Sequence, residues 1–273
     1  MATQAPTPPA TSPPVWHAAP VPGIIVYADE RLVALNKPAG VSLATRRAEP
    51  HAAVARLLAA LPHDERLQHG LAAEDLLLVH RLDVGTSGLV LLARDAEVHR
   101  DLARAFGERH VGKLYLALVW GCPRPRAGRW EWPLGPDRRD RRRMRVDPGG
   151  RRSVTDYEVL ARASHVALVR LQPATGRTHQ LRVHLAHAGH PIVGDDLYGG
   201  PRHRGIRDKE LRSALAPAHL FLHAWGLHLP ATASTPELVL VAPPPNEFAA
   251  ALEALGIPPP AFGQEPSRSG DRS

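Results

Sequence analysis

The chain has 273 residues, of which 44% are hydrophobic and 22% charged, a composition that suits a soluble globular protein with a sizeable core. Its formal net charge of +7 favours a polyanionic partner over a small neutral substrate. Cys122 is the only cysteine, which excludes internal disulfides and thiolate-rich zinc sites. Because no secretory signal pattern and no run of about 18 apolar residues occurs, we expect a cytoplasmic protein without a membrane anchor.

The two ends of the chain differ in composition from the middle. Residues 1–22 are rich in Pro, Ala and Thr, and residues 257–273 end in Pro, Gly, Ser and charged residues. Such segments bury too little apolar surface to fold by themselves, so both are predicted to be flexible tails. No fixed-period repeat and no Gly/Ser linker divides the part between them. A single domain over residues 23–256 is therefore predicted.

Short strands predominate in the predicted domain. Apolar residues at 23–27 and 32–36 flank a polar turn, as they would in a hairpin. Helical spacing follows at 52–61, and the remaining predictions in chain order are strands at 76–80 and 89–93, a helix at 96–107, strands at 113–120, 154–160 and 165–171, a helix after Thr178 and a helix at 246–255. Strands outnumber helices and seldom alternate with them. This pattern predicts an α+β domain with a mixed, mainly antiparallel central sheet and flanking helices.

One carboxylate stands out in the segment Val79–Leu89. Asp83 follows a predicted strand and precedes Gly85 and Gly88, which permit the tight backbone of a loop that lifts a side chain from a sheet edge. A carboxylate in that position can attack an electron-poor carbon or stabilise it. The structural alternative is an aspartate that only caps its own loop through an Asx-turn.

The predicted strand at 113–120 has two different faces. Strand alternation places Leu114, Leu116, Leu118 and Trp120 on one face, which we expect to be the core. Lys113 and Tyr115 fall on the other face. Tyr115 is then either a functional residue or a core tyrosine whose hydroxyl is satisfied.

A second dense segment runs over residues 176–185 and continues over residues 189–195. Arg177 lies at the start of the predicted helix, where the helix dipole disfavours a cation by about 0.3 to 1 kcal/mol. We therefore expect an acidic partner for Arg177. Asp195, Asp196 or a simple phosphate contact remain open as that partner.

Four segments, Asn36–Gly40, Val79–Leu89, Lys113–Tyr115 and residues 176–195, resemble in this order the active-site signatures of the RluA family of RNA pseudouridine synthases, and the resemblance runs from about residue 23 to about residue 248. It implies a sheet crossed by a catalytic cleft, and conversion of specific uridines in rRNA or tRNA to pseudouridine without a cofactor. RNA is then the partner of a monomeric enzyme. The residues ahead of Ile24 are too few for the N-terminal S4 RNA-binding domain that many members carry.

The resemblance also implies roles for individual residues. Asp83 would be the nucleophile, Arg177 its partner, and Tyr115 would stack on the target base and take part in proton removal from C5. Arg81 would enter the RNA stack as the uridine leaves it, unless it forms a buried ion pair. The remaining substrate-binding candidates of these segments are His80, Lys113, Thr178 and His179. The segment after Gly40 lacks a histidine or proline often found there, so the first motif is expected to give structural support.

Outside these motifs, a basic run contains Arg138, Arg139, Arg141, Arg142 and Arg143. Such a run is either a solvated loop or, in an RNA enzyme, a phosphate-contacting insertion, which is the reading that we adopt. A second candidate patch lies at residues 202–212. The sixteen histidines do not form a metal-binding spacing, so no metal site is expected.

Two other functions fit part of the sequence. A catalytically idle RNA-binding protein with the same fold would have no use for a carboxylate that faces an anionic ligand. A retaining glycosidase needs two acidic residues in one cleft, and among the motif acids only Asp83 is placed for chemistry.

Overall fold

The computed structural model describes residues 23–45, 48–258 and 260. The predicted tails at 1–22 and 257–273 therefore lie outside the described residues, apart from positions 257, 258 and 260. Ile257 is buried in a core cluster that includes Phe248 and Leu252, and its N–H donates to Leu252 O at 2.9 Å. The packed part of the chain thus extends at least to Ile257, one residue past the predicted boundary.

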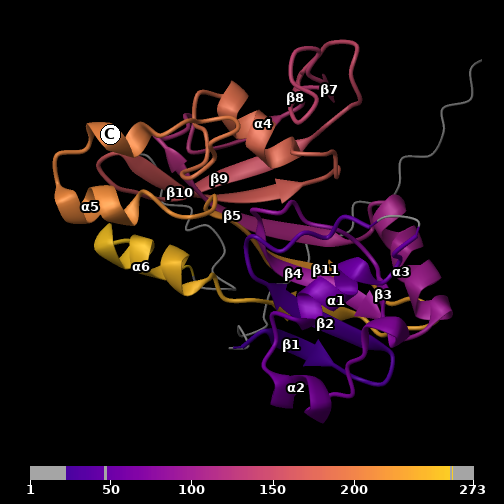
Figure 1. Ribbon diagram of the computed structural model, residues 1–273. Coiled ribbons are helices and arrows are strands. Elements are labelled where there is room, and N and C mark those ends of the chain that lie inside the picture. The colour runs from indigo at the N-terminus through magenta and orange to yellow at the C-terminus, as the bar shows by residue number, and fades with distance from the viewer. Residues whose placement is uncertain (1–22, 46–47, 259, 261–273) are drawn as a thin grey trace, which may run out of the picture.

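A ten-stranded sheet runs through the molecule (Figure 1). Its order along the sheet is β1 (Ile25–Ala28), β2 (Leu32–Lys37), β4 (Ser87–Ala93), β11 (Leu222–Leu229), β5 (Gly112–Trp120), β10 (Val166–Pro173), β9 (Thr155–Arg162) and β6 (Ala127–Trp130), with β3 (Leu77–Leu78) on β4 and β12 (Leu238–Val241) on β11. Neighbouring strands are antiparallel except β4 and β11, which are parallel. The predicted α+β class with a mixed, mainly antiparallel sheet is confirmed.

Helices cover both faces of this sheet (Figure 1). They are α1 (Ala52–Leu58), α2 (His63–Gln68), α3 (Ala96–Gly107), α4 (Gln180–His187), α5 (Lys209–Ala214) and α6 (Asn246–Ala254), with short 3₁₀ turns at η1 (Ala73–Asp75) and η2 (Arg202–Gly205). On β4, alternate residues pack against α3 on one face and against α1 on the other. On β5, the leucine face packs against α6 as predicted, and Ala117 and Val119 pack with α4. Burial on both faces explains the continuous apolar runs of these strands.

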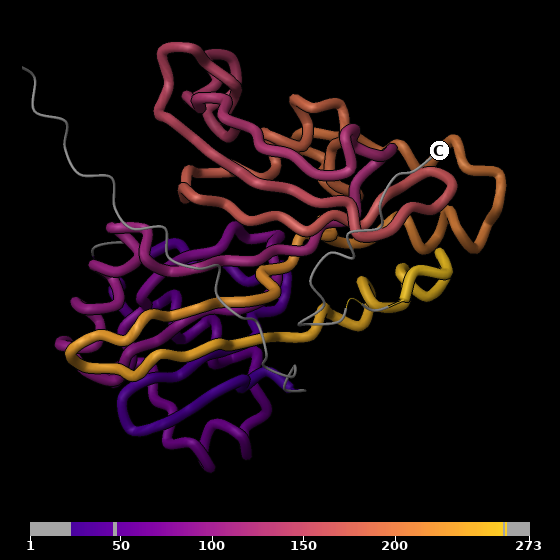
Figure 2. The backbone as a smooth tube through the Cα atoms, turned by 180° about the vertical axis from the view of Figure 1, so that it is seen from behind, coloured from indigo at the N-terminus to yellow at the C-terminus, as the bar shows by residue number. Residues whose placement is uncertain are grey.

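The strand β11 was not predicted, although it lies between β4 and β5. Figure 2 shows this late orange segment running through the half of the molecule that the N-terminal residues form. Gly88 is the residue that lets β4 approach it, because a Cβ atom there would lie 2.2 Å from Ala224 O. Its φ of +111° also favours glycine. The backbone that follows Asp83 is therefore fixed against the central strand.

Lys37, at the end of β2, ties two loops together. Its side chain is fully buried, and Nζ donates hydrogen bonds to Pro38 O (2.9 Å), Val41 O (3.1 Å) and Val84 O (3.2 Å). The N–H of Gly40 also donates to Val84 O, at 2.8 Å. The first motif thus supports the loop that contains Asp83. Burial lowers the pKa of Lys37 to about 8, although the charge of Asp83 opposes that shift.

We predict that the unfolding free energy of the parent protein, measured relative to a Lys37→Met variant, rises between pH 8 and about pH 10.4. In this window the unfolded lysine, with its ordinary pKa of about 10.4, still binds a proton that the folded protein has released. Deprotonation therefore favours the folded state, and the difference is constant below pH 8. Urea unfolding of both proteins across this range measures it. A flat or falling difference would contradict the buried cation.

Candidate active site

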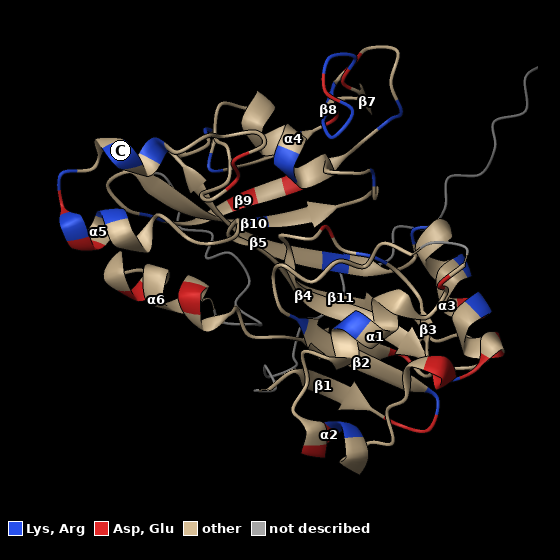
Figure 3. Cartoon of the chain, in the orientation of Figure 1, with Lys and Arg blue, Asp and Glu red and all other residues tan. Residues whose placement is uncertain are grey.

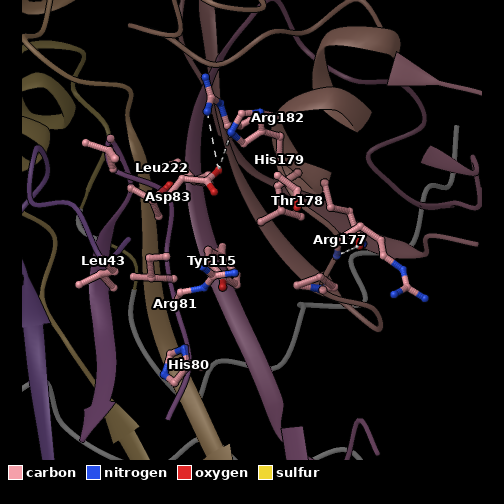
Figure 4. A pocket seen from close by; sticks show the side chains of 18 of the residues that line it. Leu43, His80, Arg81, Asp83, Tyr115, Arg177, Thr178, His179, Arg182 and Leu222 are labelled. Carbon is pink, nitrogen blue, oxygen red and sulfur yellow. Dashed lines mark hydrogen bonds and ion pairs between the residues drawn. The ribbon is translucent and has the colours of Figure 1, made fainter. Parts of the chain in front are cut away.

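A cleft of about 960 Å³ lies where the loop between β3 and β4, the start of β5 and the approach to α4 meet (Figure 4). Its lining contains these predicted residues: Asp83, Tyr115, Arg177, Arg81, His80, Lys113, Thr178, His179 and Arg142. The other members of the basic run, Arg138, Arg139, Arg141 and Arg143, lie outside the lining. The structure therefore brings residues from three of the four sequence motifs to one cavity.

Asp83 presents its carboxylate to this cleft. Oδ2 lies 3.7 Å from Arg182 Nη1 and 3.9 Å from His179 Nε2, and the side chain is 30% exposed. The backbone of the loop is fixed separately, because Asp83 O accepts from the Thr86 N–H at 3.1 Å. Within the described residues, no backbone N–H donates to the Asp83 carboxylate, so the Asx-turn alternative is not what the structure has. Its oxygens are available for a substrate.

The expected pair between Arg177 and Asp83 is wrong for this structure. Arg177 lies in the loop before α4, with Nε 3.4 Å from Arg152 O, and its guanidinium points away from Asp83 in Figure 4. The helix begins at Gln180, later than predicted, because the Gln180 side chain accepts from the Thr175 hydroxyl and the Arg177 N–H. The first-turn cation that needs an acidic partner is Arg182. In the sequence Arg182 stands between the apolar residues Leu181 and Val183, and this position could have indicated a buried arginine.

Arg182 is held by a second aspartate. Its Nε and Nη2 atoms donate to the two carboxylate oxygens of Asp195, both at 2.8 Å, and the side chains are only 10% and 1% exposed. Burial opposes the charge of Arg182, but the Asp195 hydrogen bonds and the charges of Asp195 and Asp83 outweigh it and raise its pKa. A permanent cation therefore stands beside Asp83. Asp195 was considered in the sequence only as an alternative partner of Arg177.

His179 completes the surroundings of the Asp83 carboxylate. It adopts the left-handed conformation, with φ of 54°, just before α4. Its Nδ1 lies 2.8 Å from the hydroxyl of Tyr198, a residue that the sequence analysis did not single out. Burial lowers the pKa of His179, which keeps the ring neutral at neutral pH although Asp83 favours the charged form.

Tyr115 and Lys113 face the cleft from the same side of β5. Burial, and then the charge of Asp83, raises the pKa of Tyr115, so its hydroxyl keeps its proton at neutral pH. In the described part of the chain this hydroxyl has no hydrogen-bond partner, which does not fit a core tyrosine with a satisfied hydroxyl. Burial also lowers the pKa of Lys113, and the charge of Arg109 adds to this effect.

His80 and Arg81 differ in their surroundings. The His80 ring stacks on Phe106 with centroids 4.5 Å apart, and Nε2 accepts from the Leu91 N–H at 3.2 Å. Burial lowers the pKa of His80 to about 3, so it is a neutral part of the cleft wall. Arg81 is exposed and makes no ion pair with any residue that the structure describes, which does not fit the buried-pair alternative.

The basic run forms the tip of a small hairpin, here called the arginine hairpin, made of β7 (Leu134–Pro136), β8 (Met144–Val146) and the residues between them. Figure 3 shows its basic residues, coloured blue, close together at one end of the molecule, beside α4. The exposed Arg142 pairs with Asp140 at 2.8 Å, and the Met144 N–H donates to the Tyr198 hydroxyl at 2.8 Å. The hairpin is therefore attached to the rim of the cleft.

The described residues contain no cluster of three or more His, Cys, Asp and Glu side chains arranged to hold a metal ion. In the same part of the chain, no helix has the length and apolar character needed to cross a membrane.

Comparisons with known proteins agree with this geometry. The model of a family described as RNA pseudouridylate synthase matches residues 31–187. The chain is 41% identical over 180 residues to the dual-specificity RNA pseudouridine synthase RluA of Vibrio cholerae, covering 65% of this chain and 69% of that protein. It is 38% identical over 205 residues to RluA of Escherichia coli K12, covering 74% and 84%.

Solved structures give the same result for the fold. The structure of human RNA pseudouridylate synthase domain containing 4 is 32% identical, with a TM-score of 0.68, and the match covers 87% of this chain and 94% of that one. Human RNA pseudouridylate synthase domain containing 1 is 25% identical, with a TM-score of 0.62, and the match covers 92% and 100%. Because the family match spans Lys37, Asp83 and Arg182 within more than half of the chain, this protein belongs to the RluA family of RNA pseudouridine synthases.

Proposed function

We propose that this enzyme isomerises specific uridines in structured rRNA or tRNA, with Asp83 as nucleophile and with the target base flipped into the cleft. The main support for the proposal is that a single carboxylate faces the cleft. Among the described residues, Asp83 is the only Asp or Glu that lines the cleft, and Arg182 supplies its counter-charge. A single ionised carboxylate suits a reaction that needs a nucleophile but no hydrolytic water and no metal.

The reaction breaks the C1′–N1 bond, turns the uracil, joins C1′ to C5 and finally releases the proton from C5. The Asp83 carboxylate attacks the electron-poor sugar carbon or stabilises it while the base turns, and the bond to the carboxylate breaks again as C1′ joins C5. Tyr115 offers its ring to the base. Because its hydroxyl is neutral, Tyr115 can accept the C5 proton only while it passes its own proton to the Asp83 carboxylate. N1 of the turned base takes up one proton in return, so the product is an isomer of uridine and Asp83 is ionised again.

The RNA contacts are assigned to cations at the cleft and its rim, of which Arg81 and Arg177 have no acidic partner among the described residues. A stacked uridine cannot reach Asp83, so the base has to leave its helix or come from an open loop. Arg81, exposed at the cleft, is suited to fill the space that the uridine vacates. Arg177 takes the role of a phosphate contact, since its guanidinium points away from Asp83. His80, Lys113, Thr178 and His179 form the wall, and the arginine hairpin extends the basic surface from its rim.

The alternatives fit this geometry less well. A retaining glycosidase would need a second acid in the cleft, and the described lining contains none. An idle RNA-binding protein gains nothing from a carboxylate placed where a phosphate-bearing ligand must enter.

We predict that Asp83→Asn abolishes isomerisation while RNA binding stays within a few-fold of the parent, because the amide keeps the shape of the side chain but is not a nucleophile. Release of tritium from the uracil 5-position reports turnover. The matched control is Asp64→Asn on α2, an exposed aspartate outside the cleft lining, which should leave turnover unchanged. Tritium release by the Asp83 variant at the parental rate would remove this residue from the mechanism.

We predict that substitutions of Arg182 slow the reaction of bound RNA, whereas substitution of Arg177 weakens RNA binding. Arg182→Lys keeps a positive charge but loses the bidentate fork to Asp195, so we expect the single-turnover rate on bound RNA to fall by at least about tenfold. Arg182→Ala should also destabilise the fold by about 3 to 5 kcal/mol, because Asp195 stays buried without a counter-charge. Arg177→Ala should raise KM and leave the single-turnover rate nearly unchanged. The opposite pattern would show that RNA binding moves Arg177 onto Asp83.

The arginine hairpin should contribute binding and salt dependence. Replacing Arg141, Arg142 and Arg143 by alanine should lower the slope of log K against log salt by about 0.7 for each lost single-strand contact. The reference variant replaces Arg202, Arg204 and Arg207, which are exposed, carry the same total charge and lie outside the cleft lining. If the hairpin variant binds RNA with the parental affinity and slope, the hairpin is only solvated, and a changed slope in the reference variant would place the RNA path there.

A further inference from the structure

Tyr198 lies behind the wall of the cleft, outside its lining, yet it contacts both residues that face the Asp83 carboxylate. Its hydroxyl is 2.8 Å from His179 Nδ1, and the guanidinium carbon of Arg182 is 5.0 Å from the centre of its ring. The same residue also meets the arginine hairpin, through the Met144 N–H at its hydroxyl and the guanidinium of Arg143, whose central carbon is 5.2 Å from the ring centre. One side chain thus joins the hairpin to the surroundings of Asp83.

The hydrogens in this set of contacts can be assigned from charge. A neutral His179 carries one ring proton, and its Nε2 faces the Asp83 carboxylate at 3.9 Å. A lone pair there would be repelled and an N–H attracted, so the proton belongs on Nε2 and Nδ1 is an acceptor. The Tyr198 hydroxyl must then donate to Nδ1 while it accepts from the Met144 N–H. The donors therefore run in one direction, from the hairpin backbone to Tyr198, to His179 and toward Asp83.

The ring of Tyr198 makes a second connection. Both guanidinium groups lie within the distance of about 6 Å at which a cation is attracted to an aromatic face. The N–H of Tyr198 donates to Asp195 Oδ1 at 3.2 Å, the same oxygen that accepts from Arg182 at 2.8 Å. Arg143 Nε is buried without a hydrogen-bond partner among the described residues, and the guanidinium lies over this ring. A movement of the hairpin therefore reaches Arg182 through the same tyrosine.

We propose that Tyr198 is a positioning residue that couples RNA contact at the arginine hairpin to the orientation of His179 and Arg182 around Asp83. The inference rests on the proposed function, in which Asp83 is the nucleophile and the hairpin binds RNA. Phosphates that hold the hairpin restrain Arg143 and Met144, these restrain the tyrosine, and the tyrosine restrains the two groups that face the carboxylate. Binding energy from outside the cleft is in this way used for alignment inside it.

The first test starts with the parent protein. Nitrogen-15 NMR of the parent protein should show His179 with a protonated Nε2 and an unprotonated Nδ1. In Tyr198→Phe, which keeps the ring and the Asp83 carboxylate, Nδ1 loses its donor, so its resonance should shift to that of an acceptor without a hydrogen bond. Tyr157→Phe is the matched control, because the Tyr157 hydroxyl also donates to a protein acceptor, Pro125 O at 3.1 Å, and Tyr157 lies outside the cleft lining. A proton on Nδ1 in the parent overturns the proposed chain of donors.

The second test is kinetic. In Tyr198→Phe we expect the Kd for RNA to stay near the parental value and the single-turnover rate at saturating RNA to fall about tenfold, the effect of leaving one buried acceptor unsatisfied. Tyr157→Phe should keep the parental rate. A parental rate in Tyr198→Phe overturns the coupling, and if Asp83→Asn is inactive at the same time, the proposed function stands without it. Activity in Asp83→Asn would instead overturn the proposed function.

Discussion

The bidentate pair between Arg182 and Asp195 determines how the cleft is built. A cation in the first turn of α4 opposes the helix dipole, and only the nearly inaccessible carboxylate of Asp195 makes that position tenable. The same carboxylate accepts the N–H groups of Leu197 and Tyr198, so the turn that follows takes its shape from the pair. A buried ion pair adds little net stability, but it permits few geometries. Here that restriction places one permanent positive charge next to Asp83.

Opposite this pair, a second buried cation shapes the other wall of the cleft. Lys37 donates its three hydrogen bonds to backbone carbonyls and none to a carboxylate. It therefore fixes the path of the chain around Asp83 without neutralising the charge of that residue. The two cations have different roles, because Lys37 holds the loop and Arg182 lies beside the Asp83 carboxylate. Such a division leaves the carboxylate oxygens open toward the substrate.

Much of this arrangement could be predicted from local patterns. A few neighbouring residues are enough to indicate the glycine-rich loop around Asp83, the two faces of β5 and the hairpin of β1 and β2. β11 could not be predicted in this way, because it is buried on both faces and carries His223, whose ring is satisfied only by distant groups, Ser87 Oγ at 2.9 Å and Ala242 O at 3.0 Å. Arg177 was preferred to Arg182 because the start of α4 depends on a side-chain network around Gln180 that sequence spacing does not reveal. The sequence did not indicate a role for Tyr198, because the residues that it contacts lie in three separate segments.

The position of β11 in the sequence affects when the cleft can assemble during synthesis of the chain. β4 carries the loop of Asp83 and β5 carries Tyr115, yet these two strands do not pair with each other; each pairs with β11. A ribosome therefore releases Asp83 and Tyr115 long before the strand that sets their separation. Contacts between residues so far apart in the chain form slowly and late in folding. Until residues 222–229 are available the two halves of the cleft have no common frame, so Asp83 and Tyr115 of a nascent chain are not yet held in their relative positions.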